Sequence, residues 1–433
     1  MSFTSQFFSS SITQFIMLAA GLFNSIILVR YLGAEGNGIY ALAVLASTAV
    51  TVFLGGSGSL QGANPYWVKK MRSEANIIFS NSLFFAFVVL AVLLFLFKLA
   101  GGLLPADFLS ASIVFLVILA VPVLLFQQYS QGVLWGLDEI NKHNVVLIFR
   151  SVLLVIANLI LVIWLKSGVE KTVSGWLIVS IAAACLSFYF VRASLGNISL
   201  KTNMRIFIRS FATTVKGISV DAISFIGTRL DVFLIMYYLG PVNVTYYSIA
   251  ILVADVNNLI PGSVGRLIFN RAVNNGSMPL AQLSKAGRLC MAYSIGTCLF
   301  LLLFSKYPIT IFYGKDFSKT FYCLIFLLPG MISQNMNVTI NNFLNAREGY
   351  PLFYVFATYA TVIINIILNI LLIPRVGIIG AAVSFSVSNV LRTCLLSKYL
   401  FSRVDISFKN FMVPRISDMS LLRYWKVKKE GYC

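Results

Sequence analysis

The sequence predicts an all-α polytopic membrane protein, with about twelve transmembrane helices in two homologous six-helix bundles around a central cavity. Three observations support this fold class. Of the 433 residues, 59% are hydrophobic and only 11% are charged, whereas soluble globular proteins carry about 25% charged residues. Apolar segments of about 20 residues, the length that crosses about 30 Å of hydrocarbon, recur along the chain. The third observation is a sequence pattern that occurs twice.

The apolar segments define the predicted helices in chain order. They cover residues 7–29, 39–60, 77–97, 113–135, 145–165, 173–193, 211–238, 244–265, 287–304, 320–343, 353–373 and 377–399. We do not expect the first segment to be a cleavable signal peptide, because no Lys or Arg precedes it and no small-residue cleavage site follows it. We interpret it as a retained first helix.

The distribution of Lys and Arg predicts that both termini are cytoplasmic. With the N-terminus inside, the inner segments hold 22 of these residues and the outer loops hold 8, as the positive-inside rule requires. The net charge of +19 therefore lies in short loops and a basic tail that face an anionic inner leaflet. This distribution indicates contact with membrane lipids and argues against a nucleic-acid partner.

The twofold pattern predicts the domain organisation. Residues 31–33 (Tyr-Leu-Gly) match residues 238–240 at an offset of 207, and Tyr40 matches Tyr247 at the same offset. We therefore predict a six-helix half at 1–205, a second at 206–403 and a basic cytoplasmic tail at 404–433. Because six is even, both halves enter the membrane in the same direction, as in transporters built from parallel repeats that enclose a central cavity.

The stretch VRYLGAEGNGIY (29–40) contains three glycines beside an Arg, which is typical of a phosphate-binding loop. Its second copy keeps Leu-Gly but loses the Arg, the Glu and the other two glycines. Phosphate cradles also need a preceding strand, whereas an apolar helix precedes this one. We interpret the stretch as the turn between two membrane helices, and only Arg30 remains a candidate for substrate binding.

Ionisable groups inside membrane spans are costly, and they are functional candidates by default. The segment 211–238 holds Lys216, Asp221, Arg229 and Asp231, and the next segment holds Asp255. We predict that the three acids line a cavity or couple transport to an ion. The alternative is that Asp221 and Asp231 pair with Lys216 or Arg229 and hold the fold together.

A second set of candidates consists of amide pairs spaced i, i+4, which places both members of a pair on one helical face. Such amides can bind sugar hydroxyls or, alternatively, join helices to one another. Arg266 and Arg271 add positive charge at the predicted cytoplasmic end of their helix. The predicted substrate-binding residues are Arg30, Lys216, Arg229, Arg266, Arg271, Gln127, Gln131, Asn337 and Asn341.

The sequence predicts neither a metal site nor an enzyme. The six cysteines contain no CxxC pair, and most of them fall inside predicted helices. The single histidine, His143, lies in the turn GLDEINKHN without a cluster of Cys or acidic residues around it. No arrangement in the chain resembles a nucleophile beside its base.

Four stretches occur in an informative order: VRYLGAEGNGIYALA (29–43), RLDVFLIMYYLGPVNVTYYSIA (229–250), FLNAREGYPLFY (343–354) and IPRVGIIGAAVS (373–384). Together they resemble the polysaccharide transporters of the multidrug/oligosaccharidyl-lipid/polysaccharide (MOP) exporter superfamily. The resemblance is closest to the O-antigen flippases of the Wzx type, and it extends over nearly all of residues 1–400.

This resemblance implies a protein of the bacterial inner membrane. Such a protein would move an undecaprenyl-diphosphate-linked oligosaccharide from the cytoplasmic to the periplasmic leaflet by alternating access, without a cofactor and with H⁺ or Na⁺ as candidate coupling ions. A polysaccharide polymerase and a chain-length regulator are the implied protein partners. Arg30 and Asp231 are the residue types that the family typically has at these positions.

Two other functions stay open at the level of sequence. One is an ion-coupled exporter of drugs or metabolites from the same superfamily, in which the carboxylates handle cations. The other is a membrane scaffold for glycan assembly that transports nothing, since a twofold repeat can persist in an inactive relative.

Overall fold

A computed structural model describes residues 3–56, 68–69, 71–100, 110–196, 201–264, 280–348, 352–404, 410–411 and 413 of the chain. Every secondary-structure element in these residues is helical. Eleven of the described helices are long and apolar enough to cross a membrane. The predicted fold class, an all-α polytopic membrane protein, is confirmed.

The chain divides by its internal contacts into two compact units, Met1–Ile249 and Ala250–Cys433. The predicted halves, 1–205 and 206–403, divide it by sequence repetition instead, and they remain a prediction. The first unit contains α1 (Phe3–Thr51), η1 (Val52–Gly56), η2 (Arg72–Glu74), α3 (Ala75–Ala100), α4 (Ala111–Gly136), α5 (Ile140–Asn158), η3 (Leu159–Trp164), α6 (Val169–Leu195), α7 (Met204–Leu239) and most of α8 (Pro241–Ala254). The second unit contains η4 (Asp255–Asn258), α10 (Leu280–Phe304), α11 (Lys306–Tyr313), η5 (Lys315–Phe317), α12 (Ser318–Glu348), α13 (Leu352–Val376) and α14 (Ile378–Arg403).

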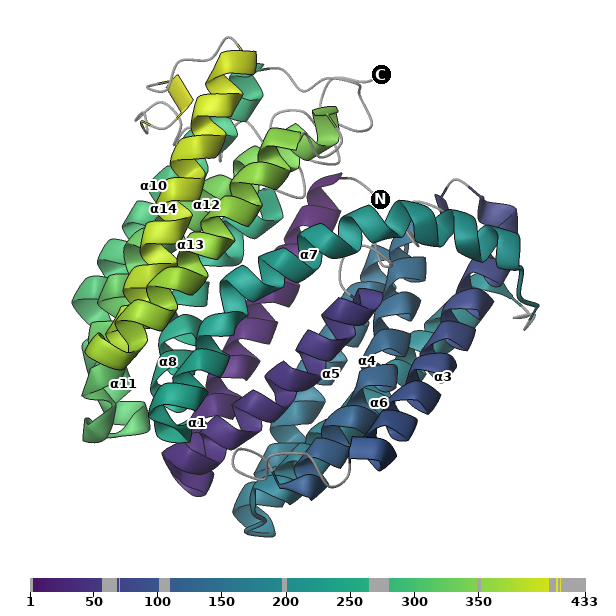
Figure 1. Cartoon of the computed structure of the whole chain (residues 1–433), viewed down its shortest axis with the longest axis horizontal. Helices are drawn as coiled ribbons and strands as arrows, with labels where there is room; N and C mark the ends of the chain where they lie inside the picture. The colour runs from purple at the N-terminus through teal and green to yellow at the C-terminus, as the bar shows by residue number, and fades with distance from the viewer. Residues whose placement is uncertain are drawn as a thin grey trace. The chain divides into compact units, whose positions relative to one another are not determined.

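Helix α1 accounts for two of the predicted spans. Its 49 residues would extend about 73 Å as a straight helix, more than twice the thickness of the hydrocarbon core. Gly33 interrupts it with φ 73° and ψ 175°, and the helix bends back at this kink (Figure 1). Eleven helices therefore accommodate the twelve predicted apolar segments.

The turn between α7 and α8 has the same backbone conformation as this kink. Gly240 has φ 79° and ψ 179°, and its N–H donates to the Met236 carbonyl at 3.1 Å. Glycine adopts this conformation without the strain that a β-carbon would add. Pro241 then begins α8, at a position where its missing N–H costs nothing. The interpretation of residues 29–40 as a turn between helices is confirmed, and its second copy at 238–240 is a turn as well.

The core of the first unit lies among α1, α4, α5, η3 and α6. Leu28, Tyr40, Ala120 and Trp176 are among its buried side chains. Large apolar side chains also cover the outside of the first unit's helices; Phe87 of α3 is 68% exposed and Trp164 of η3 is 83% exposed. Apolar surface on both sides of a helix is expected where the bilayer is the solvent.

In the second unit, α14 packs against both α12 and α13. Ser386 of α14 donates from its Oγ to the Phe326 carbonyl oxygen of α12 at 2.5 Å and accepts the Gly330 N–H at 3.0 Å. Small residues of this kind let membrane helices approach each other closely and form hydrogen bonds across the contact.

Candidate functional site

The most deeply buried acid in the described part of the chain is Asp231 of α7, with 3% of its surface exposed. The hydroxyl of Tyr247 in α8, itself fully buried, donates to Oδ2 of Asp231. The Val232 N–H donates to Oδ1 at 2.8 Å. Half-buried Arg229, two residues earlier on α7, attracts the carboxylate electrostatically. Asp231 is thus a buried carboxylate with donors to both oxygens, inside a helix of membrane-spanning length.

The first repeat contains a neutral counterpart of this pair. Asn24 and Tyr40 occupy the positions that match Asp231 and Tyr247 at the offset of 207. Asn158 of α5 donates from Nδ2 to Oδ1 of Asn24 at 2.6 Å. Both matched pairs of positions therefore hold a buried tyrosine and a buried polar side chain, but only the second pair includes an acid.

The predicted amide pairs lie on buried helix faces. Gln127 and Gln131 of α4 are 2% and 8% exposed, and the Gln127 Nε2 atom is buried without a hydrogen-bond partner. Asn337 of α12 accepts the Thr393 hydroxyl of α14 at 3.1 Å, so it joins two helices. One turn further along α12, the Oδ1 atom of Asn341 is buried without a partner. Asn337 has the helix-joining contact that was the alternative interpretation, while Gln127 and Asn341 keep unused polar atoms.

The remaining predicted residues lie in separate places. Half-buried Asp255 accepts the Asn258 Nδ2 at 2.9 Å within η4. Arg30 is exposed and lies three residues before the kink of α1. Arg266 and Arg271 lie outside the described residues, and so do the side chains of Lys216 and Asp221. The proposed pairing of Asp221 with Lys216 or Arg229 therefore remains a prediction.

Sequence reasoning missed a cation inside the second unit. Arg392 lies within α14, where its Nη2 donates to the Thr358 hydroxyl at 3.0 Å and to the Tyr354 hydroxyl at 3.5 Å, both in α13. Its guanidinium carbon lies 5.7 Å from the centre of the Tyr354 ring, and its Nε is buried without a partner. Its position inside the predicted apolar segment 377–399 was a signal of burial.

Arg392 contacts a buried polar stripe on the neighbouring helix α13. The stripe consists of residues at helical spacing along one face, each at most 5% exposed: Tyr354, Thr358, Thr361, Asn365 and Asn369. Asn369 donates from Nδ2 to Oδ1 of Asn365 at 3.0 Å, and its own Oδ1 is buried without a partner. Polar atoms left unpaired in a membrane span are costly, so this stripe is a second candidate for contact with a polar substrate.

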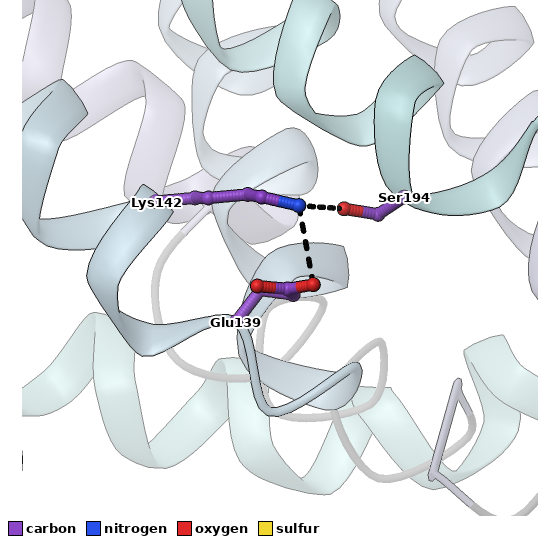
Figure 2. Close-up of polar contacts among 3 residues, drawn as sticks. All are labelled: Glu139, Lys142 and Ser194. Atoms are coloured by element: carbon purple, nitrogen blue, oxygen red, sulfur yellow. Dashed lines mark hydrogen bonds and ion pairs between the residues drawn. The ribbon is translucent and has the colours of Figure 1, made fainter. Parts of the chain in front are cut away.

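His143, which the sequence places in a turn, lies in the first turn of helix α5, and this region has a structural role. Lys142 donates to Glu139 Oε1 at 3.1 Å and to the Ser194 hydroxyl of α6 at 2.9 Å, which ties the start of α5 to α6 (Figure 2). The His143 ring stacks on Trp135, with 5.9 Å between ring centres. In the part of the chain that the structure describes, no three His, Cys, Asp or Glu side chains gather where they could hold a metal ion.

Comparison with known proteins gives the family. Residues 3–264 match the family described as "Polysaccharide biosynthesis protein". The "Probable low-salt glycan biosynthesis flippase Agl15" of Haloferax volcanii is 26% identical over 404 residues, 91% of this chain and 82% of that protein. The "Putative O-antigen transporter" of Shigella flexneri is 22% identical over 402 residues, 88% of this chain and 94% of that protein.

A solved structure gives the fold. The chain is similar to "Lipid II flippase MurJ, inward closed conformation", with a TM-score of 0.78 and 19% identity over 98% of this chain and 93% of that one. At this identity the likeness shows the fold alone, which agrees with the helices described above. The family match covers more than half of the chain. The chain therefore belongs to the polysaccharide biosynthesis protein family, the Wzx-like flippases of the MOP superfamily, and is a multi-pass membrane transporter rather than an enzyme.

Proposed function

We propose that the chain moves an undecaprenyl-diphosphate-linked oligosaccharide, an O-antigen repeat unit, from the cytoplasmic to the periplasmic leaflet of a bacterial inner membrane. The observation that carries this proposal is the family match over residues 3–264. The names of the two relatives, a glycan flippase and an O-antigen transporter, support a lipid-linked glycan as the substrate. Both termini are cytoplasmic in this proposal, and a polymerase and a chain-length regulator receive the product.

The cations in the predicted spans and at their ends bind the diphosphate. The predicted set is Arg30, Lys216, Arg229, Arg266 and Arg271, to which we add Arg392. A guanidinium presents several N–H groups in a fixed plane that suits phosphate oxygens. A buried cation inside a membrane span also gains an anionic partner when such a substrate enters.

The amides bind the sugar, because each amide offers both donors and acceptors to hydroxyl groups. Gln127 and Asn341 are the strongest candidates, since each has a buried polar atom without a partner. Gln131 and Asn337 lie one turn away on the same helices. The polyprenyl tail stays in the bilayer, whose apolar interior suits it.

Binding of H⁺ or Na⁺ at a buried acid drives the return step. Asp231 is the strongest candidate because it is buried inside a membrane-spanning helix and has donors to both oxygens. Asp221 and Asp255 are the other predicted acids. The first repeat has the neutral Asn24 at the position of Asp231, so we assign coupling to the second repeat.

The test is complementation of a strain that lacks its O-antigen flippase. We expect the Arg229→Ala and Asp231→Ala variants to reach the membrane at normal levels and to leave the cells without surface O-antigen. Lys69→Ala is the matched control, because Lys69 is 62% exposed and pairs only loosely with Asp138, at 3.8 Å. Normal O-antigen display in both variants would refute the assignment. Drug sensitivity without any polysaccharide defect would support the exporter alternative instead.

A further inference from the structure

The kink of α1 and the turn between α7 and α8 are in direct contact. The Thr245 hydroxyl of α8 donates to the Ala34 carbonyl oxygen at 2.5 Å. The Asn37 Nδ2 donates to the Thr245 hydroxyl oxygen at 3.3 Å. Both polar side chains are buried, with Thr245 at 0% and Asn37 at 5% exposure. All of these residues belong to the first unit.

A second contact joins the same two segments through their backbones. A β-carbon on Gly38 would lie 2.0 Å from the Pro241 carbonyl oxygen and 2.6 Å from its carbonyl carbon. Real side chains do not approach a carbonyl group so closely, so only glycine at position 38 lets the two segments touch. This contact explains a glycine that the helix turn itself does not need.

The two contacts are related by the internal repeat. The offset of 207 carries Ala34 onto Pro241 and Gly38 onto Thr245. Exchanging the repeats therefore converts the Gly38–Pro241 contact into the Thr245–Ala34 contact. A contact in which i meets j and j meets i is isologous, and it marks a local two-fold relation between the segments. Gly33 and Gly240, which match at the same offset, also share one backbone conformation.

We propose that residues 34–38 and 241–245 form a latch that closes one end of the transport pathway and opens once in each cycle. This inference rests on the proposed function. When two parallel repeats rock against each other, a reciprocal contact between equivalent turns must break as that end opens. The latch contains only two side-chain hydrogen bonds and one backbone contact among the described residues, so little interaction energy opposes its opening. In the expected orientation the latch faces the periplasm.

The first test measures whether the latch opens. Spin labels are attached at two exposed tyrosine positions beside the latch, through Tyr31→Cys and Tyr238→Cys. The six native cysteines of the chain are replaced beforehand. We expect a short label–label distance in lipid nanodiscs. The Gly38→Ala change should make a longer distance predominant, because its β-carbon cannot fit against Pro241. Gly296→Ala is the matched control, since a β-carbon there meets nothing within 4 Å.

A less disruptive variant tests the same contact in case Gly38→Ala does not fold. Thr245→Val keeps the side-chain shape and removes the hydroxyl, and with it both side-chain hydrogen bonds of the latch. It should raise the ratio of open to closed forms about thirtyfold, the effect of two hydrogen bonds. Thr48→Val is its control, because the Thr48 hydroxyl bonds only within its own helix, to the Val44 carbonyl at 2.8 Å. A distance distribution that neither Gly38→Ala nor Thr245→Val changes would overturn the latch.

The second test asks whether opening is needed for transport. Ala34→Cys and Thr245→Cys are combined in the same cysteine-free chain and oxidised to a disulfide. Transfer of undecaprenyl-diphosphate-linked oligosaccharide across proteoliposomes should stop on oxidation and return on reduction, whereas Ala34→Cys alone should be insensitive. Full transport by the cross-linked protein would contradict the latch. A reduced chain that moves no lipid-linked oligosaccharide would refute the proposed function, and the spin-label distances then decide the latch separately.

Discussion

The hydrogen bond from Tyr247 to Asp231 should be among the strongest single side-chain interactions between α7 and α8. Both side chains are almost completely buried, at 0% and 3% exposure, and the acceptor is a carboxylate. Hydrogen bonds to charged groups contribute about 1.5–3 kcal/mol, whereas neutral ones between membrane helices average about 0.6 kcal/mol. Tyr247→Phe should therefore lower the free energy of unfolding by about 2 kcal/mol.

A double-mutant cycle separates this bond from the general effect of losing a hydroxyl. In the Asp231→Asn background the acceptor is neutral, so Tyr247→Phe should cost only about 0.6 kcal/mol. Unfolding is followed by tryptophan fluorescence in mixed micelles with a rising fraction of sodium dodecyl sulfate. Tyr189→Phe is the matched control because that side chain is 64% exposed. If Tyr247→Phe costs no more than this control, or costs the same in both backgrounds, the bonded carboxylate is not the source of the stability.

Two further predictions use the same assay. Gly33→Ala and Gly240→Ala should each lower the free energy of unfolding by about 1–3 kcal/mol, because the φ and ψ angles of these glycines lie in a region that is nearly exclusive to glycine. Gly296→Ala, in open space inside a helix, should instead raise the free energy of unfolding by up to about 1 kcal/mol. Equal effects at all three sites would contradict the backbone argument. Arg392→Met should change stability by less than about 1 kcal/mol, because loss of the contacts to Thr358 and Tyr354 is offset by removal of a half-buried charge inside a membrane span. The variant should nevertheless abolish surface O-antigen, and normal display would exclude Arg392 from anion binding.

The helices could be predicted because hydropathy and length report a strict physical requirement. A chain in hydrocarbon must satisfy every backbone polar group internally, so each long apolar segment has to be a helix. The offset of 207 predicted that residues 31–33 and 238–240 are equivalent, and the structure gives Gly33 and Gly240 one conformation. The role of Gly38 could not be predicted from the sequence, because this role depends on contact with Pro241, which lies far along the chain.

The candidate site could be predicted only in part, because its contacts also join residues that lie far apart in the sequence. Helical spacing shows that Asn337 and Asn341 share a face, but not which helix meets that face. The structure shows α14 beside it, with Thr393 bonded to Asn337. Likewise, the partner of Asn24 is Asn158, which is 134 residues away. Polar residues in membrane spans can be located by composition, whereas their partners require the fold.

The most direct test of the account is a flipping measurement with the purified chain in proteoliposomes. Undecaprenyl-diphosphate-linked oligosaccharide is incorporated in both leaflets, and an impermeant glycosidase is added outside. Vesicles without protein should lose only the outer half of the sugar. Vesicles with the chain should lose nearly all of it, and vesicles with the Arg229→Ala or Asp231→Ala variant should behave like empty ones. Protection of half of the sugar by vesicles that contain the intact chain would contradict the account.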